Sequence, residues 1–470
     1  MRESVEFNSA DFGLRTETQY ARREKPDSPN PFRIILLGDF SGRGAGTGKA
    51  REVDPDNFDD VLAALSPSVT LPLAGGDAEV RFRGLDDFHP DSLYTRIPAF
   101  HDPATQAFLR QQTAPKPAGP ETKPAAAPAP APPRASSGSI LDDMLNVQSG
   151  AAAASPAPVR RDEFSDVIRA IVRPHLAPVP HAAAAEYARL EQVYASELMR
   201  AILRHPGFRA LEASWRSLDF FVRRVPTGGD IRLAILEVRK ADLTADILKR
   251  VLGGFDERYA LCIGLYEFGP EDAGHLDALA AVAAAANAPF VAGARPQMLG
   301  KSTFANLEQE RNFSLPAEFT GLRRGANASY LGLALPRFML RPPYGPKTSG
   351  VDAFDFTEIP ETPAHDDYLW GNSAIACAVV LAAAFESGGW EEMASSINPE
   401  VEGLPVHTWG PPASPDMTPC AETWMTEELA MQLMNAGFLA FASLKRRDAI
   451  RLLRLQSISE QSPSLRGPWD

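Results

Sequence analysis

The glycine-rich stretch at residues 38–50 (GDFSGRGAGTGKA) is the segment whose composition could bind a phosphate. A loop of this kind can present backbone N–H groups to an anion. A nucleotide-binding phosphate loop, however, requires Gly, four residues, Gly-Lys and then Ser or Thr. Here Arg43 stands five residues before Gly48, and Ala50 follows Lys49. We interpret residues 42–49 as a surface turn, and a nucleotide-dependent enzyme using this loop is the least favoured function.

Histidines and cysteines are spaced in no pattern that is typical of a metal site or a catalytic dyad. The three cysteines share no ligand spacing, and no two of the eight histidines have the separation of a zinc site; these residues are Cys262, Cys377, Cys420, His89, His101, His175, His181, His205, His275, His365 and His407. His365 is followed by two aspartates, which could be half of a metal site but more plainly begin a helix. We therefore predict no catalytic, cofactor-binding or metal-binding residue, no cofactor and no enzyme activity.

Two arginines lie where they could clamp a carboxylate. Arg337 and Arg341 flank apolar residues directly after a predicted buried strand. A guanidinium group can hold a carboxylate with two parallel hydrogen bonds, within one fold or across an interface. An anion or substrate site is one reading of this pair, and an ion-paired structural junction is the favoured one.

A helix predicted over residues 206–222 is the element around which these candidates are organised. Its apolar residues recur at steps of three and four and form one stripe: Phe208, Leu211, Trp215, Leu218 and Val222. Pro206 suits the first turn of a helix, where its missing N–H is not needed. Glu212 with Arg216, and Asp219 with Arg223, are i,i+4 pairs expected on a wetter face. The pattern predicts an amphipathic core helix.

Strands and helices alternate after this helix, which predicts an α/β fold. We expect strands at 231–238, 259–266, 289–292 and 329–336, with helices at 243–252 and 272–286 between them. Alternation of this length favours βαβ units on a mainly parallel sheet. Further helices are predicted at 164–172, 183–203, 366–385, 426–435 and 445–457. Before them, residues 32–38 form a buried-strand pattern, 56–65 a helix, and 69–73 with 78–82 a hairpin.

The segment at 113–160 separates two parts of different composition. It is rich in proline and alanine and cannot form a packed core, so we expect a disordered tether. Within it, residues 139–146 are a short amphipathic helix candidate that could dock onto a partner through Ile140, Leu141, Met144 and Leu145. The predicted organisation is a mobile arm at 1–30, a small segment at 31–112, the linker at 113–160 and a large region at 161–470.

Charge and composition restrict the partners. The 470 residues carry a net charge of −13, which argues against nucleic acid or an anionic membrane as the main partner. Three cysteines suit a reducing compartment. The first thirty residues lack the apolar core of a signal peptide, and the apolar run at 373–385 is shorter than a membrane span. We expect a cytoplasmic protein without membrane insertion.

The amino-acid sequences of several segments resemble those of a known family. HPGFRALEASWRSL at 205–218 is similar to the signature of the large contractile-sheath subunit of bacterial type VI secretion systems. Further matching pieces follow in that family's order: IGLYEF at 263–268, APFVA at 288–292, YLGLALPRFMLRPPYG at 330–345, FDFTE at 354–358, YLWGN at 368–372 and GLPVHT at 403–408. The resemblance covers residues 165–460.

The N-terminal segment resembles the small sheath subunit. PFRIILLGDFSG at 31–42, VDPDNFD at 53–59 and LDDFHPD at 85–91 match its opening. The resemblance implies a natural fusion of both subunits, with a phage-tail-sheath-like mixed α/β core and a smaller N-terminal α/β segment. It also implies other sheath subunits or a second copy as partners, with an inner tube, a baseplate and an AAA+ disassembly ATPase as further ones.

Two departures from the family pattern bear on the expected function. The large subunit normally continues past residues 445–456 into a further domain that exchanges strands, and the small-subunit part is short here. The first hypothesis is a structural sheath component; the alternative is a non-contractile cap, adaptor or terminator. Six residues are expected to be critical to the scaffold through packing and junctions rather than through ligand contacts: Phe208, Trp215, Arg337, Arg341, Trp370 and Asn372.

Overall fold

The computed structural model describes residues 31–44, 49–73, 76–103, 105–107, 109, 183–253, 258–305, 307–309 and 313–470. The predicted arm at 1–30, the linker at 113–160 with its helix at 139–146, and the helix predicted at 164–172 lie outside the described residues. The sequence-based expectations for those segments therefore stay predictions.

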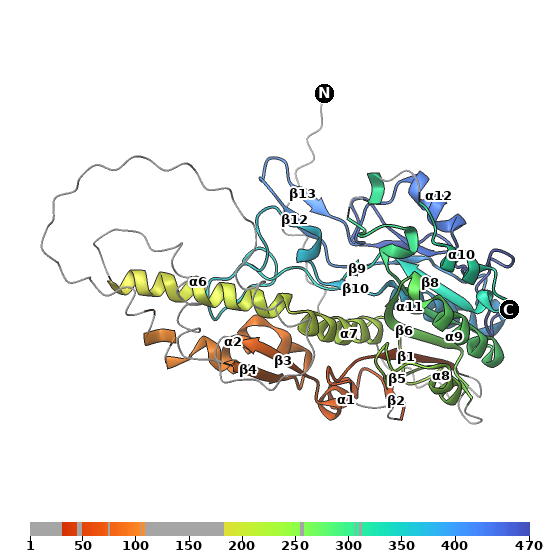
Figure 1. The fold of residues 1–470 in the computed structure, drawn as a ribbon, viewed down its shortest axis with the longest axis horizontal. Coiled ribbons are helices and arrows are strands. Elements are labelled where there is room, and N and C mark those ends of the chain that lie inside the picture. Colours follow the sequence, from red (N-terminus) through yellow and green to blue (C-terminus); the bar gives the residue numbers. More distant parts are fainter. Residues whose placement is uncertain are drawn as a thin grey trace, which may run out of the picture.

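A nine-stranded sheet forms the centre of the molecule (Figure 1). Its strands from β14 to β5 run parallel. On one side β2 pairs antiparallel with β5, and on the other β15 pairs antiparallel with both β14 and the edge strand β11. In spatial order they are β11 (Glu400–Val401), β15 (Ile450–Leu452), β14 (Leu439–Ser443), β8 (Leu331–Leu335), β7 (Phe290–Ala294), β6 (Leu261–Phe268), β1 (Phe32–Gly38), β5 (Ile231–Glu237) and β2 (Arg51–Val53). This arrangement confirms the predicted α/β class.

Strand β1 comes from the N-terminal segment but lies inside the sheet. It pairs in parallel with β5 along its whole length, from Phe32 opposite Ile231 to Gly38 opposite Glu237, and with β6 on its other side. Its sequence FRIILLG is almost fully buried, as expected for a parallel strand covered on both faces. The N-terminal segment and the large region therefore share one sheet.

Helices cover both faces of the sheet, and alternate residues of β1 point to the two resulting cores. Ile34 and Leu36 belong to the core beneath α7 (Pro206–Val222) and α11 (Ser373–Glu392). Ile35 and Leu37 belong to the opposite core, which contains α8 (Ala245–Leu252), α9 (Ala273–Ala286), α10 (Ala317–Arg323) and α12 (Glu427–Asn435). The period of two along the strand explains this division.

A smaller layer lies beside the long helix α6 (Ala183–Arg204) (Figure 1). The N-terminal segment contributes α1 (Phe58–Leu65), the hairpin of β3 (Ser68–Leu73) and β4 (Gly76–Arg81), and α2 (Pro90–Arg96).

Two further strand pairs belong to the large region. They join β9 (Phe338–Met339) to β10 (Trp370–Gly371) and β12 (His407–Trp409) to β13 (Asp416–Thr418). Short 3-10 turns are Leu85–Phe88, Pro98–Phe100, Pro270–Asp272, Pro296–Leu299, Leu307–Gln309, Ala328–Tyr330 and His365–Asp367.

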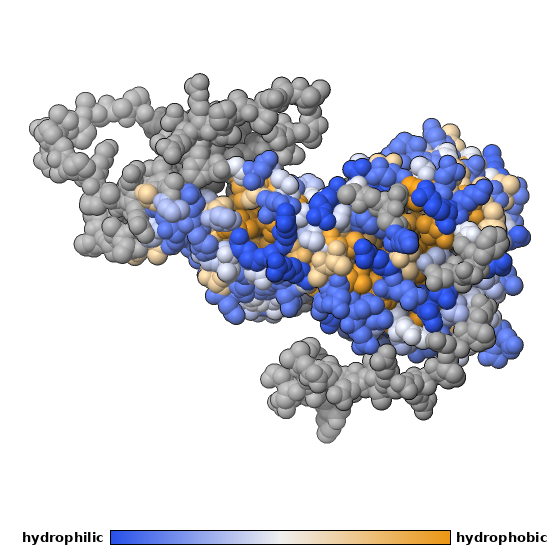
Figure 2. All heavy atoms as spheres, turned by 90° about the horizontal axis from the view of Figure 1, so that it is seen from below, coloured by the Kyte–Doolittle hydropathy of each residue, from blue (hydrophilic) through white to orange (hydrophobic). Residues whose placement is uncertain are grey.

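Apolar areas are visible among hydrophilic residues on the face seen from below (Figure 2). Among the described residues, the large apolar side chains that are exposed are Val406 and Met431. The remaining apolar surface therefore comes from partly buried side chains.

Helix α7 confirms the helix predicted at 206–222. Pro206 occupies its first turn, and the ring of His205 accepts a hydrogen bond from the N–H of Phe208 at 3.4 Å. Burial lowers the pKa of His205, which favours the neutral ring that this hydrogen bond needs.

Two helix predictions near the C-terminal part are wrong. Residues 445–457 contain strand β15, which pairs with both β14 and β11. Arg446 has a φ of 61°, so the chain turns there instead of continuing as a helix. The helix predicted to begin at 366 begins at Ser373, because the Asn372 side chain accepts the N–H of Ala374 at 2.9 Å and caps it.

The apolar run that begins at Ser373 belongs to helix α11, which is long and apolar enough, by length and composition, to cross a membrane, so the expectation that it is too short is wrong. It is the one such helix among the described residues. Two thirds of the relevant stretch is buried, 67%. It packs against β6, β7, β8 and α7 inside the protein. This burial and packing are typical of the core helix of a globular fold.

Candidate assembly core

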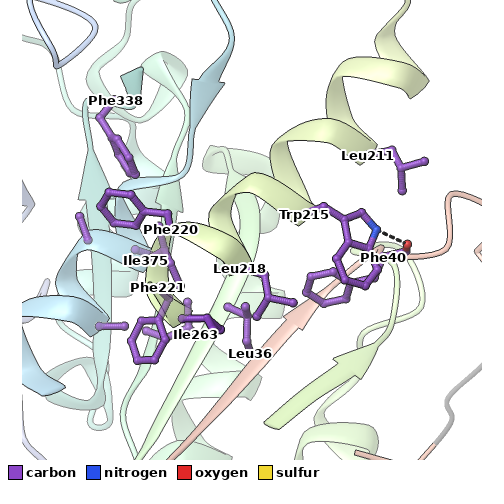
Figure 3. Close-up of a cluster of buried hydrophobic side chains, with 14 of the residues drawn as sticks. Leu36, Phe40, Leu211, Trp215, Leu218, Phe220, Phe221, Ile263, Phe338 and Ile375 are labelled. Atoms are coloured by element: carbon purple, nitrogen blue, oxygen red, sulfur yellow. Dashed lines mark hydrogen bonds between the residues drawn. The ribbon is translucent and has the colours of Figure 1, made fainter. Parts of the chain in front are cut away.

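Trp215 and Phe208 connect α7 to the N-terminal segment. Trp215 is completely buried, and its indole N–H donates to the carbonyl oxygen of Phe40 at 2.8 Å (Figure 3). Its ring meets those of Phe40 and Phe58 edge to face, at 5.5 and 5.9 Å. Phe208, also completely buried, meets the stacked pair of Phe82 and Phe88 in the same way. The aromatic partners of Trp215 and Phe208 all precede the linker in the sequence: Phe40, Phe58, Phe82 and Phe88. These contacts therefore join the two parts of the chain.

Glu237, which the sequence did not single out, fixes the turn that follows β1. Its carboxylate accepts hydrogen bonds from the N–H of Phe40 at 2.7 Å, the N–H of Ser41 at 3.1 Å and the Ser41 hydroxyl at 2.8 Å. Burial raises the pKa of Glu237, and these donors partly oppose that rise. The signal in the sequence is that Glu237 ends a strand in which Arg232 is the other charged residue and the rest are apolar.

The described part of the 42–49 loop supports its interpretation as a turn. Gly42 has a φ of +69°, and a Cβ added there would lie 2.3 Å from the carbonyl oxygen of Ser68. Residues 45–48 lie outside the described part of the chain. Lys49 is exposed, and strand β2 follows it, so the loop does not lead into a helix N-terminus of the kind that binds phosphates.

Arg341 occupies a buried cluster of charges. Its guanidinium group contacts Glu212 at 2.8 Å and Glu358 at 2.7 and 3.0 Å. Arg216 approaches the same Glu212 carboxylate at 2.7 Å. Burial opposes ionisation of Glu212, but Arg341 and Arg216 together hold its pKa below the usual value. The expectation that Glu212 lies on a wetter face is wrong, since its side chain is 0% exposed.

Glu358 completes this cluster from a distant loop. It also accepts the backbone N–H of Tyr344 at 2.7 Å, and the Arg341 guanidinium lies over the Tyr344 ring at 4.1 Å from its centre. Both carboxylates that clamp Arg341 are thus part of the same chain. The geometry is that of an intramolecular ion-paired junction.

Arg337 forms a second junction with Glu422. Its Nε donates to the Glu422 carboxylate at 3.0 Å, and a second guanidinium nitrogen contacts the other carboxylate oxygen. The backbone N–H of Arg337 also donates to this carboxylate, at 3.1 Å, and the N–H of Glu422 donates to the carbonyl oxygen of Arg337 at 2.8 Å. Nε2 of His365 lies 2.7 Å from Glu422. Burial alone would raise the pKa of Glu422, but His365 and Arg337 lower it. Burial would lower the pKa of His365, but Glu422 and Asp366 raise it.

Asn372 and Trp370 fix the start of α11. The Asn372 amide donates to the carbonyl of Tyr266 at the end of β6, at 2.8 Å, while its oxygen caps the helix. The Trp370 indole donates to the carbonyl of His365 at 2.9 Å, and its ring stacks on the His365 ring at 5.7 Å. Trp370 is therefore linked to Arg337 through His365 and Glu422, since His365 contacts Glu422 and Glu422 pairs with Arg337.

The chemistry available at these junctions is packing and charge pairing. Among the described residues, no group of three or more His, Cys, Asp or Glu side chains is placed to hold a metal ion. The three cysteines are buried, and burial raises the pKa of Cys377 to about 12 and of Cys420 to about 11. Protonated, enclosed thiols are poor nucleophiles.

Comparisons with known proteins relate this chain to sheath proteins of type VI secretion systems. Residues 188–459 match the family model of the VipB (EvpB) tail sheath N-terminal domain, and residues 17–103 match that of the VipA protein of the type VI secretion system. An alignment over 290 residues is 29% identical to the type VI secretion system sheath protein TssC1 of Pseudomonas aeruginosa. The aligned part covers 55% of this chain and 58% of the relative, so the chain spans less than two thirds of the relative's length.

Proposed function

This chain belongs to the VipB family of tail sheath proteins, and we propose that it is a structural building block of a type VI secretion sheath that joins both sheath segments in one polypeptide. The proposal rests on the family match over residues 188–459, together with the separate match of residues 17–103 to the VipA family.

One observation carries the proposal furthest: strand β1 of the VipA-like segment completes the sheet of the VipB-like region. It lies between β5 and β6 and pairs with both. A sheath built from two different subunits needs them in equal numbers. A single chain that contains both segments in one sheet satisfies that requirement by covalent linkage.

In this proposal the protein acts by assembly and catalyses no reaction. Its partners are other sheath subunits or further copies of itself, and the inner tube, the baseplate and an AAA+ ATPase are proposed as later partners. Free energy for contraction would reside in packing between subunits. The net charge of −13 and the buried position of α11 support a place in the cytoplasm.

The six scaffold residues are proposed to act by joining segments of the chain. Three of them contact the α7 junctions or belong to them: Phe208, Trp215 and Arg341. The other three order the segments around His365 and the start of α11: Arg337, Trp370 and Asn372. Their replacement is expected to reduce stability and, through it, assembly.

Electron microscopy of the purified full chain tests the proposal, alone and mixed with candidate sheath and tube subunits. Helical tubes formed by the chain alone, or tubes into which it is incorporated, would support a sheath building block. Particles that bind at the ends of filaments would instead support the alternative of a cap, adaptor or terminator. A chain that binds neither sheath nor tube subunits would contradict both.

A further inference from the structure

The two ends of the nine-stranded sheet carry charges of opposite sign. At one end, β15 and the turn that joins it to β14 contain five basic residues and one acidic residue between positions 445 and 454. At the other end, the segment from β2 into α1 contains five acidic residues and no basic residue between positions 52 and 60. We name residues 445–454 the basic edge and residues 52–60 the acidic edge.

The basic edge has cations without partners in its turn. Arg447 and Arg451 both pair with Glu400 of the neighbouring strand β11. Lys445 and Arg446 are exposed, and within the described residues no carboxylate lies within 4.0 Å of either side chain. Their charges are therefore available to a partner.

Arg446 also occupies a backbone position that few arginines adopt. Its φ of 61° lies in the left-handed region, which favours glycine or asparagine. The turn is closed by a hydrogen bond from the N–H of Leu444 to the carbonyl oxygen of Ala449 at 2.9 Å. Unfavourable backbone positions of this kind are concentrated at functional segments, and the exposed guanidinium group is the chemistry that this turn presents.

The acidic edge presents carboxylates without partners. Glu52 lies 3.7 Å from both Arg33 and Arg232, so its charge is balanced within the fold. Asp59 and Asp60 are exposed, and among the described residues no cation lies within 4.0 Å of either. Their helix α1 lies beside β2 (Figure 1), which places both carboxylates at this end of the sheet.

We propose that the basic edge of one copy of this chain binds the acidic edge of a second copy. The inference deepens the proposed sheath function and rests on it for the choice of a second copy as partner. Because the two surfaces lie at opposite ends of one sheet, each contact leaves one basic edge and one acidic edge free. Contacts between unlike surfaces of this kind form open filaments or closed rings.

Pairing of side-chain charges is the interaction that these edges offer. The outermost strands β11 and β2 have two and three residues, and short, charged edge strands resist the addition of a further strand. A nucleic acid is less favoured as a partner. Asp448, Glu400 and Glu402 stand among the cations of the basic edge, and the whole chain carries a net charge of −13.

The test is reversal of these charges in the full chain, with self-association measured by sedimentation. Lys445→Glu with Arg446→Glu makes both edges acidic, and Asp59→Lys with Asp60→Lys makes both edges basic. Each double variant alone is expected to self-associate about tenfold more weakly than the wild type, since repulsion replaces attraction at exposed positions. An equimolar mixture of the two variants should associate, and a chain with all four changes should recover the self-association of the wild type.

Lys249→Glu with Arg250→Glu is the matched control. It makes the same chemical change at two exposed neighbours on α8, which covers a face of the sheet, and should leave self-association unchanged. Raising the salt concentration from about 0.1 M to about 1 M shortens the Debye length from about 10 Å to about 3 Å, so it should weaken association of the wild type.

Three results would each overturn the edge contact: equal self-association of the wild type and both reversal variants, a mixture as dissociated as its components, or a monomeric wild type at about 0.1 M salt. A basic edge that binds a DNA oligonucleotide without affecting self-association would also overturn it. Electron microscopy separates this failure from failure of the sheath function. Reversal variants that enter sheath tubes as well as the wild type would leave the sheath function standing without the edge contact, whereas a wild type that enters no tube would contradict the sheath function itself.

Discussion

The indole N–H of Trp215 donates to the carbonyl oxygen of Phe40 at 2.8 Å, across 175 residues of chain (Figure 3). On the amide side, the N–H of Phe40 donates to Glu237. Both polar groups of one residue in the turn after β1 are thus satisfied by the large region. The VipA-like segment is therefore held by directional bonds in addition to the burial of β1.

Replacing Trp215 separates its two contributions to stability. Trp215→Ala removes a large, fully buried ring and is expected to lower the free energy of unfolding by about 3–5 kcal/mol. Trp215→Phe keeps most of the apolar contact but leaves the Phe40 carbonyl without its donor, which costs about 1–3 kcal/mol. Urea titration of the full chain measures both, with the exposed Met431→Ala as a control that should change little. A Trp215→Phe variant as stable as the wild type would contradict a separate role for the hydrogen bond.

The buried carboxylate of Glu212 is expected to matter far more than a surface carboxylate on the same helix. Glu212→Gln leaves Arg341 and Arg216 without their shared counter-charge, and breaking a buried pair in this way costs about 3–5 kcal/mol. Asp219→Asn makes the same chemical change in the exposed pair with Arg223, where the loss is below about 1 kcal/mol. Chemical denaturation of both variants gives the comparison. A Glu212→Gln loss no larger than that of Asp219→Asn would show that the cluster does not stabilise the fold.

The fold class could be predicted because each element carries its own signal. The run at Ile231–Glu237 is apolar except at Arg232 and Glu237, which is typical of a buried strand. The apolar residues of α7 recur with the helical period. The side of α7 that is buried was also predictable from Phe208 and Trp215. Local periodicity identifies an element and its apolar face, and these are properties of neighbouring residues.

Tertiary partners could not be predicted from periodicity. Glu212 reads as half of an i,i+4 surface pair, and only the loop that brings Arg341 beside it, 129 residues later, makes its site buried. The segment with Ile450 and Leu452 has apolar spacing that suits a helix or a strand. Its pairing with β14 and β11 decides for the strand, and that pairing depends on residues far away in the sequence.

His365 is expected to give the protein a stability component that weakens as the pH rises. Although burial favours its neutral form, Glu422 and Asp366 raise its pKa above the ordinary value of 6.5. The folded state thus holds the proton more tightly, so the contribution is complete below about pH 6.5 and is lost as the pH rises through the folded-state pKa. The measurement is the difference in unfolding free energy between wild type and His365→Gln across that range.

This difference isolates His365 from other histidines. Burial lowers the pKa of His205, His275 and His407, so their contributions have the opposite sign and are lost as the pH falls. They are present in both proteins and cancel in the difference. A difference that stays constant from below pH 6.5 upward would contradict the ion pair between His365 and Glu422.

The amphipathic segment at 139–146 is expected to bind a partner through its apolar face. Leu141→Asp combined with Leu145→Asp should weaken capture of sheath subunits by about tenfold or more, since each buried leucine contributes about 1.5–3 kcal/mol. Ala127→Asp with Ala131→Asp introduces the same charges at the same spacing elsewhere in the linker and serves as the control. Pull-down by the full chain measures both. Equal capture by the two double variants would remove the docking role.

Cleavage of the linker is expected to leave the two parts of the chain associated. A specific protease site inserted after Pro133 allows the folded full chain to be cut between the VipA-like and VipB-like parts. Separation would expose the buried β1 and open two strand edges, on β5 and β6, that pair with it in the sheet. Open strand edges and exposure of an apolar strand to water are both unfavourable, so the fragments should elute together from a sizing column.

Leu36→Asp places a charge at the buried centre of β1 and should make the cut fragments separate or aggregate. Dissociation of the cut wild-type chain under native conditions would show that β1 does not hold the two parts together.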